Sequence, residues 1–170
     1  ADRNAVSTSN NVRRDIHNNP NSELKPFKSK VRLYESKNKI RNVVGIIVNK
    51  DNKILLVRRS DKSEWMPNLW SFVGGGVDRD ETAIRAVRRE IIEEVGLDIN
   101  DFINSFTIQR NGDDNTVEYI YVCRYDGNDT DVILNPENVS YGWFGVNEIT
   151  YLNTVPHIAE YLTLTFKKYE

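Results

Sequence analysis

The chain of 170 residues is poor in cysteine, in long apolar segments and in net charge. Its one cysteine, Cys123, cannot close a disulfide within the chain, which favours a reducing compartment such as the cytoplasm. No apolar segment approaches the roughly 20 residues that span a bilayer, so we expect no membrane partner. A formal net charge of −2 gives no overall preference for nucleic acid, and a hydrophobic content of 39% is typical of one globular domain.

Positive charge is nevertheless concentrated near the amino terminus. Residues 1–42 contain ten Lys or Arg against four Asp or Glu, a net charge of +6, so the remaining 128 residues carry −8. Because the start of this segment is rich in Asn and Ser, we expect residues 1–28 to form a polar basic arm and residues 29–170 the folded domain. The composition fits a solvated tail, and it also fits an arm that reaches phosphates or an acidic partner.

Apolar periodicity from about residue 30 predicts an alternation of strands and helices. The β-branched segments 41–49 and 53–59 flank Lys50-Asp51-Asn52, which predicts a hairpin. Residues 61–69 are expected to form a loop. Further strands are expected at 31–35, 69–73, 102–110, 116–125 and 139–146, and helices at 80–95 and 156–168. Strands on both sides of a central helix predict an α/β fold with a mixed sheet sandwiched between helices (α/β/α).

The helix expected at 80–95 carries an unusual cluster of like charge. At 100° per residue, Glu90, Glu93 and Glu94 share one narrow face. Small residues lie beside them and an apolar stripe lies next to this face: Ala83 and Ala86 in the first group, Ile84, Ile91 and Val95 in the second. Like charges on one face destabilise a helix, whereas hard divalent cations prefer oxygen ligands. The face is therefore either a solvated acidic surface or a metal site.

The residues around this helix favour the metal site. The spacing G-x5-E-x7-R-E-U-x-E-E-x-G-U, with U aliphatic, is satisfied by Gly75, Glu81, Arg89, Glu90, Ile91, Glu93, Glu94, Gly96 and Leu97. This segment resembles the Nudix box at every specified position. The preceding Trp70-Ser71-Phe72-Val73-Gly74-Gly75 resembles the W-x-x-P-G-G that commonly leads into the box, with Val73 in place of the proline. The resemblance implies a Nudix fold and a hydrolase.

The same resemblance implies a set of metal ligands. They would be the carboxylates of Glu90, Glu93 and Glu94 and the Gly74 carbonyl, binding Mg²⁺ or Mn²⁺. Arg89 would pair with Glu81 or Glu93 and so align the carboxylates. The glycines at 74–76 are expected to let the chain turn tightly at the start of the helix and to offer backbone groups to the site.

Family members usually add one further metal-binding carboxylate from outside the box, and this residue can also serve in catalysis. Glu137 is the preferred candidate because it lies six residues before Trp143, a spacing similar to that in MutT-type members. Glu118 and Glu148 are the alternatives, and an ordinary loop glutamate is the competing interpretation of Glu137. Either Glu90 or Glu137 would accept the proton of the attacking water, so the general base stays open between them.

Substrate-binding residues follow from the resemblance to MutT-like members. Arg59, Phe72 and His157 occupy positions similar to base-contacting ones in that group. Arg59 also fits a charge at a strand edge, and His157 a residue at the start of a helix. The three tryptophans are expected to pack in the core rather than to stack on a ligand: Trp65, Trp70 and Trp143.

The implied activity is hydrolysis of a nucleoside diphosphate linked to a further group. The tags of the ADP-ribose, diadenosine polyphosphate and NADH subtypes are missing after the box, which favours a nucleoside triphosphate, oxidised ones included, or a nucleotide sugar. Two alternatives remain: an RNA-end (cap) processing enzyme, which the basic arm supports, and a nucleotide-sensing module without catalysis. The intact glutamates weigh against the second alternative. A homodimer stays open.

Overall fold

The computed structural model describes residues 40–111 and 115–167. The basic arm expected at 1–28 and the strand expected at 31–35 lie outside these residues, so both stay predictions. In the described part, no helix is long and apolar enough to cross a membrane.

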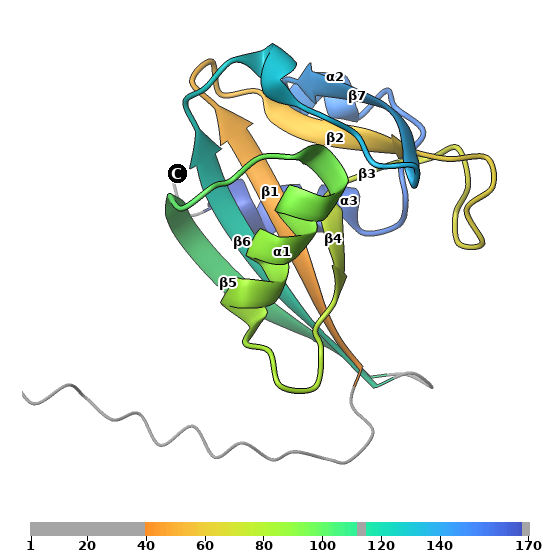
Figure 1. Cartoon of the computed structure of the whole chain (residues 1–170), viewed down its shortest axis with the longest axis vertical. Coiled ribbons are helices and arrows are strands. Elements are labelled where there is room, and N and C mark those ends of the chain that lie inside the picture. Colours follow the sequence, from red (N-terminus) through yellow and green to blue (C-terminus); the bar gives the residue numbers. More distant parts are fainter. Residues whose placement is uncertain (1–39, 112–114, 168–170) are drawn as a thin grey trace, which may run out of the picture. The chain divides into compact units, whose positions relative to one another are not determined.

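A seven-stranded mixed sheet forms the centre of the described residues (Figure 1). The main path is β3-β2-β1-β6-β5, and β4 and β7 pair with β1 and β2 off this path. Only β1 and β6 run parallel among the strand pairs of the described part. The strand bounds are β1 Arg41–Asn49, β2 Ile54–Arg59, β3 Trp70–Ser71, β4 Val73–Gly76, β5 Phe102–Arg110, β6 Thr116–Tyr125 and β7 Asn138–Phe144.

Helices cover both faces of this sheet, which confirms the predicted α/β/α arrangement. Helix α1 (Ala83–Val95) packs on one face, and α3 (Ile158–Phe166), with the short α2 (Val146–Ile149), packs on the other (Figure 1). A 3-10 turn, η1 (Asp129–Asp131), precedes β7. Alternate residues of β1 point to different layers, since Val43 and Ile47 join the α1 core and Ile46 and Val48 join the α3 core. The two buried clusters therefore hold the sheet from both sides.

Local signals explain where α1 begins and ends. Thr82 is its N-cap residue, with extended backbone angles. Gly96 ends the helix in the left-handed conformation (φ 71°), which a residue without a Cβ adopts readily, and its N–H donates to the Ile92 carbonyl. The helix therefore starts three residues later than the expected 80 and ends at 95 as expected.

The core-facing side of α1 differs from the predicted apolar stripe. Ile91 and Val95 are fully buried as expected, but Ile84 is 38% exposed because it precedes the buried segment that begins at Ala86. Ala86 belongs to the core, and Glu94 is also buried. The side of α1 that meets the sheet therefore includes the apolar stripe and the neighbouring Glu94. This orientation brings the Glu94 carboxylate against β4.

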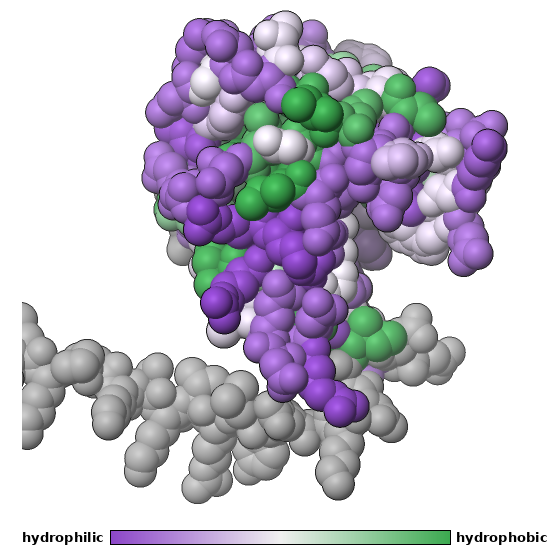
Figure 2. All heavy atoms as spheres, in the orientation of Figure 1, coloured by the Kyte–Doolittle hydropathy of each residue, from purple (hydrophilic) through white to green (hydrophobic). Residues whose placement is uncertain are grey.

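Some apolar side chains remain exposed around α1, where Figure 2 shows green spheres among purple ones. The exposed large apolar residues include Ile92 of α1, at 44%, and Ile133, at 73%. Ile133 is held at the carboxyl end of α1, since its N–H donates to the Val95 carbonyl. Ile133 also lies next to Gly96, just beyond the end of α1.

Candidate active site

Strand β4 lies so close to both β1 and α1 that Gly74 and Gly75 have no space for a side chain. A Cβ on Gly74 would collide with the Val43 carbonyl oxygen of β1, and one on Gly75 would lie 2.5 Å from the Glu90 carboxyl carbon. The expected tight turn is wrong, since these glycines form a strand and only Gly96 has positive φ among the described glycines. They are needed for close approach between backbone and carboxylates.

Glu94 is the most enclosed carboxylate of this region, with 6% of the residue exposed. Its Oε1 accepts a hydrogen bond from the Gly74 N–H (2.8 Å), and its Oε2 accepts one from the Asn138 side-chain amide (2.9 Å). Burial raises the pKa of Glu94 to about 7, although these two hydrogen bonds oppose the rise, and the charges of Glu90 and Glu137 add to it. Sequence reasoning missed Asn138, because nothing in its local sequence marks a side chain that orients Glu94.

Arg89 connects the box glutamates to one another and to β4. Its guanidinium forms a two-pronged ion pair with Glu81, at 3.1 and 2.9 Å, and contacts Glu90 at 2.6 Å and Glu93 at 3.3 Å. It also donates to the Gly76 carbonyl at 2.9 Å. The predicted pairing with Glu81 or Glu93 is confirmed for both, and Glu90 joins them. The Arg89 hydrogen bond also lowers the pKa of Glu81.

The chemistry of these donors fits a divalent cation. Burial raises the pKa of Glu90, and the charges of Glu93 and Glu137 raise it further, against the effect of Arg89. Three negative groups from α1 and the Glu137 loop thus repel one another around β4, and a cation with two charges would offset this repulsion. Among residues 40–111 and 115–167, no three acidic, His or Cys side chains are already gathered into a ligand set.

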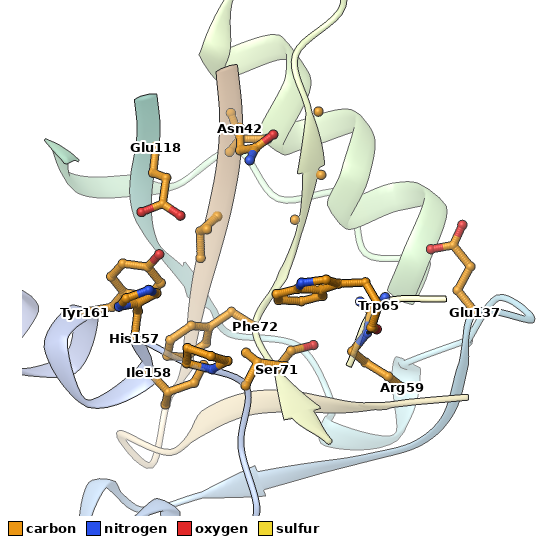
Figure 3. Close-up of a pocket in the computed structure, with 17 residues that line it drawn as sticks. Asn42, Arg59, Trp65, Ser71, Phe72, Glu118, Glu137, His157, Ile158 and Tyr161 are labelled. Carbon is orange, nitrogen blue, oxygen red and sulfur yellow. Dashed lines mark hydrogen bonds between the residues drawn. The ribbon is translucent and has the colours of Figure 1, made fainter. Parts of the chain in front are cut away.

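A pocket of about 420 Å³ lies beside β4 (Figure 3). Every residue predicted to bind substrate lines it, and so do Gly74 and Glu137. Figure 3 shows Glu137 at one side of the pocket and Glu118 with Tyr161 at the other. The lining residues that the sequence analysis did not place in a substrate site include Asn42, Trp65, Ser71 and Tyr161. The carboxylates of Glu90, Glu93 and Glu94 do not line this pocket. The pocket reaches Gly75 of β4, and the Glu90 carboxylate packs against that glycine.

The alternative carboxylates have other partners. Glu148 accepts a hydrogen bond from the Gly145 N–H and caps α2, outside this pocket. Glu118 lines the pocket but pairs with Arg110 at 2.6 Å. Arg110 also contacts Glu160 at 2.9 Å, which ties β5 to α3 behind the pocket wall. Of the three candidates for the further carboxylate, Glu137 best fits the prediction, since its charge raises the pKa of both Glu90 and Glu94.

Trp65 contradicts the prediction that all three tryptophans pack in the core. Trp70 packs edge-on against Phe144 at 5.1 Å, and Trp143 stacks on Tyr125 at 6.1 Å, as expected. Trp65 instead lines the pocket and is 54% exposed. Its position in the polar loop 61–69, away from any apolar periodicity, is the sequence signal that could have indicated this.

Comparisons with known proteins match this geometry. The NUDIX domain family matches residues 39–164. An 8-oxo-dGTP diphosphatase of Buchnera aphidicola is 31% identical over 111 residues, which cover 65% of this chain and 81% of that enzyme. An RNA pyrophosphohydrolase of Pelagibacter ubique is 42% identical over 59 residues, 34% of this chain and 35% of that enzyme. The MutT protein of Methanosarcina mazei Go1 superposes with a TM-score of 0.64 at 23% identity, over 79% of this chain and 99% of that one, and so shares the fold.

Replacing Arg89 by Ala should lower both stability and rate, because Glu81 and Glu90 would lose their shared cation. We expect a loss of about 2 kcal/mol in the free energy of unfolding and at least a tenfold loss of rate, roughly what a removed supporting contact costs. Arg88→Ala is the matched control, since Arg88 forms an exposed ion pair with Asp98. Denaturant unfolding and steady-state kinetics measure both. Normal stability with only a raised KM would show that Arg89 contacts substrate instead.

The raised pKa of Glu94 predicts how the metal-free protein responds to pH. The folded state holds this proton up to about pH 7, whereas the unfolded chain releases it near the ordinary value of 4.5. Stability should therefore fall as pH rises from about 4.5 to 7, by up to ~3 kcal/mol, and level off above. In Glu94→Gln this fall should largely disappear, while Glu93→Gln, at a side chain 55% exposed, should retain it. Thermal unfolding of the three proteins in EDTA between pH 4.5 and 7 measures this dependence. Equal slopes of stability against pH in all three proteins would contradict the prediction.

Proposed function

Because the chain belongs to the Nudix hydrolase family, we propose that it is a metal-dependent pyrophosphohydrolase that cleaves a nucleoside diphosphate linked to a further group. The observation that carries the proposal is that β4 lies between the α1 carboxylates and the pocket. On one side of this strand lie the α1 carboxylates, and on the other lies a pocket of about 420 Å³ with aromatic and basic walls. A substrate that spans the strand would place its base in the pocket and its phosphates at the carboxylates.

The proposed cation site consists of the carboxylates of Glu90, Glu93 and Glu94 with the Gly74 carbonyl. When bound, Mg²⁺ or Mn²⁺ would neutralise phosphate oxygens and favour charge on the leaving oxygen. Arg89 holds Glu90 and Glu93 in place, and Asn138 with the Gly74 N–H holds Glu94. The ligands are thus oriented from two directions by groups of the protein itself.

Glu137 is the proposed general base. The Glu90 carboxylate is already held by Arg89, whereas Glu137 is exposed at the pocket wall, near enough for its charge to act on Glu90 and Glu94. Glu137 would take a proton from water as the water oxygen bonds to phosphorus. The anhydride P–O bond breaks, and its electron pair leaves with the departing phosphate or nucleotide. The products are a nucleotide shortened by this cleavage and the released phosphate compound.

The proposed substrate is a nucleoside triphosphate, oxidised ones included, or a nucleotide sugar. The similarity to an 8-oxo-dGTP diphosphatase over most of that enzyme's length supports the first class. Arg59, Phe72 and His157 line the pocket that would receive the nucleoside. RNA-end processing is the second candidate, and two observations favour it: the similarity to an RNA pyrophosphohydrolase and the charge of +6 in residues 1–42.

Glutamine variants should separate the cation ligands from the base. We expect Glu90→Gln to lower kcat about 10²–10³-fold and to abolish the rise in melting temperature on adding Mg²⁺, because a ligand is lost. Glu137→Gln should lower kcat by a similar factor yet retain that rise, because only the base is lost. Kinetics on nucleoside triphosphates and a nucleotide sugar, with thermal unfolding, provide both readouts.

Two controls make this experiment decisive. Glu148→Gln, a carboxylate that caps α2 outside the pocket, should leave kinetics and Mg²⁺ response unchanged. Excess EDTA should abolish activity, and full activity in EDTA would refute the metal-dependent proposal. Loss of the Mg²⁺ response in Glu137→Gln would make Glu137 a ligand rather than the base.

Deleting residues 1–24 distinguishes a small nucleotide substrate from an RNA-end substrate. A free nucleotide is short, so we expect kcat/KM for nucleotides to change by less than about tenfold, or ~1.4 kcal/mol. An RNA substrate would use cations of the arm, and its hydrolysis would depend steeply on salt. The measurement compares full-length and truncated protein on a nucleoside triphosphate and a capped RNA at two salt concentrations. If only the RNA is cleaved, and cleavage collapses on truncation or in salt, RNA-end processing replaces the preferred proposal.

A further inference from the structure

Trp65 is a large aromatic residue held at the rim of the pocket instead of in the core. It is 54% exposed, and its ring projects into the pocket in Figure 3. An exposed indole forgoes much of the free energy that burial of a tryptophan would provide. A position that keeps it exposed inside a cavity therefore points to a ligand that covers it.

The loop holds Trp65 in this position through Arg59. The Arg59 guanidinium lies over the indole ring at 5.1 Å from its centre, and its Nε donates to the Trp65 carbonyl at 2.9 Å. Ser63 accepts a second hydrogen bond from Arg59 at 2.6 Å and donates to the same carbonyl at 2.9 Å. Met66 follows with a φ of 46°, which a side chain of this size rarely adopts, and Asn68 with a φ of 62°, which Asn tolerates. The indole is thus positioned before any ligand arrives.

The wall across the pocket suits a flat, heteroaromatic group. Phe72, His157 and Tyr161 supply rings there, with Tyr161 at 6.3 Å from both of the others. Glu118, whose side chain is 14% exposed, brings a carboxylate that accepts N–H donors and repels phosphate. Arg110 is shared between Glu118 and Glu160, so it does not fully neutralise this end. A nucleobase fits these walls, and a phosphate chain does not.

We infer that Trp65 is the stacking residue for the nucleobase and that Arg59 is a positioning residue that acts through Trp65. The base lies on the indole face that Arg59 leaves open, with its polar edge toward Glu118. This inference rests on the proposed nucleotide substrate and names the base as the part that Trp65 recognises. It assigns Arg59 to this role in place of the predicted base contact, because two of its five N–H donors and one face of its guanidinium are engaged within the loop.

Binding of guanosine monophosphate, cytidine monophosphate and ribose 5-phosphate, measured by calorimetry with Mg²⁺, tests the inference without requiring turnover. Trp65→Ala should weaken guanosine monophosphate binding about tenfold or more, and cytidine monophosphate less, because stacking follows the size of the base. Ribose 5-phosphate, which has no base, should bind both proteins alike. Trp65→Phe should stay within about threefold of wild type, whereas Trp65→Leu, similar in apolar character but without a π face, should resemble Trp65→Ala.

Fluorescence gives an independent readout. Guanosine monophosphate should quench tryptophan emission in the wild type and in Trp70→Phe, whose indole packs against Phe144, but not in Trp65→Phe. Thermal unfolding of Trp65→Ala should match the wild type, since the residue is 54% exposed. Quenching that persists in Trp65→Phe, or equal binding of guanosine monophosphate by wild type and Trp65→Ala, would overturn the inference.

A double-mutant cycle tests the role of Arg59. Arg59→Ala and Arg59→Lys should each weaken guanosine monophosphate binding about as much as Trp65→Ala, since Lys keeps the charge but lacks the planar fork. Adding Arg59→Ala to Trp65→Ala should cause no further loss. A further loss, or weaker ribose 5-phosphate binding, would show direct contact by Arg59 and refute its positioning role. Intact binding without hydrolysis would count against the proposed function and leave this inference standing.

Discussion

The close approach of a glycine strand to a helix of carboxylates is the constraint on which the site depends. The Gly74 N–H reaches the Glu94 carboxylate at 2.8 Å, and Gly75 leaves space for the Glu90 carboxylate that any side chain would fill. Residues with a Cβ would push β4 away from β1 or from α1. The buried Glu94 would then lose a hydrogen bond that compensates for its burial. Sheet pairing, helix position and carboxylate geometry therefore rest on the same two glycines.

Partial neutralisation explains how the carboxylates can lie near one another despite their mutual repulsion. Arg89 alone contacts Glu81, Glu90 and Glu93, so one cation is shared among three anions, and Glu94 relies on neutral donors. The region keeps an excess of negative charge at neutral pH. Such an excess destabilises the metal-free protein and is the electrostatic basis for cation binding in the proposed mechanism. Function and stability are thus opposed at this position.

The pocket shows where sequence reasoning reached its limit. Arg59, Phe72 and His157 were expected near a base through the family resemblance, and all three line one cavity. The same reasoning expected Trp65 in the core, because composition gives no information on which tryptophan a loop leaves exposed. Its true position depends on hydrogen bonds from Arg59 and Ser63 within that loop. These contacts are local in sequence, but the resemblance gave no spacing that marks them, and only the position in a polar loop indicated that Trp65 is exposed.

Local periodicity and turn residues were enough to predict the hairpin of β1 and β2, the end of α1 next to Gly96 and the layer order. The Arg89 contacts with Glu81 and Glu93 came from the family resemblance of the box. Contacts between residues far apart in the chain could be seen only in the folded molecule. Asn138 reaches Glu94 across 44 positions, and Gly74 reaches it across 20. Ile84 has the spacing of a core residue yet is 38% exposed, because it lies in the first turn of α1, before the buried part of the helix that begins at Ala86. Periodicity specifies which side chains share a face, whereas long-range packing specifies what that face meets.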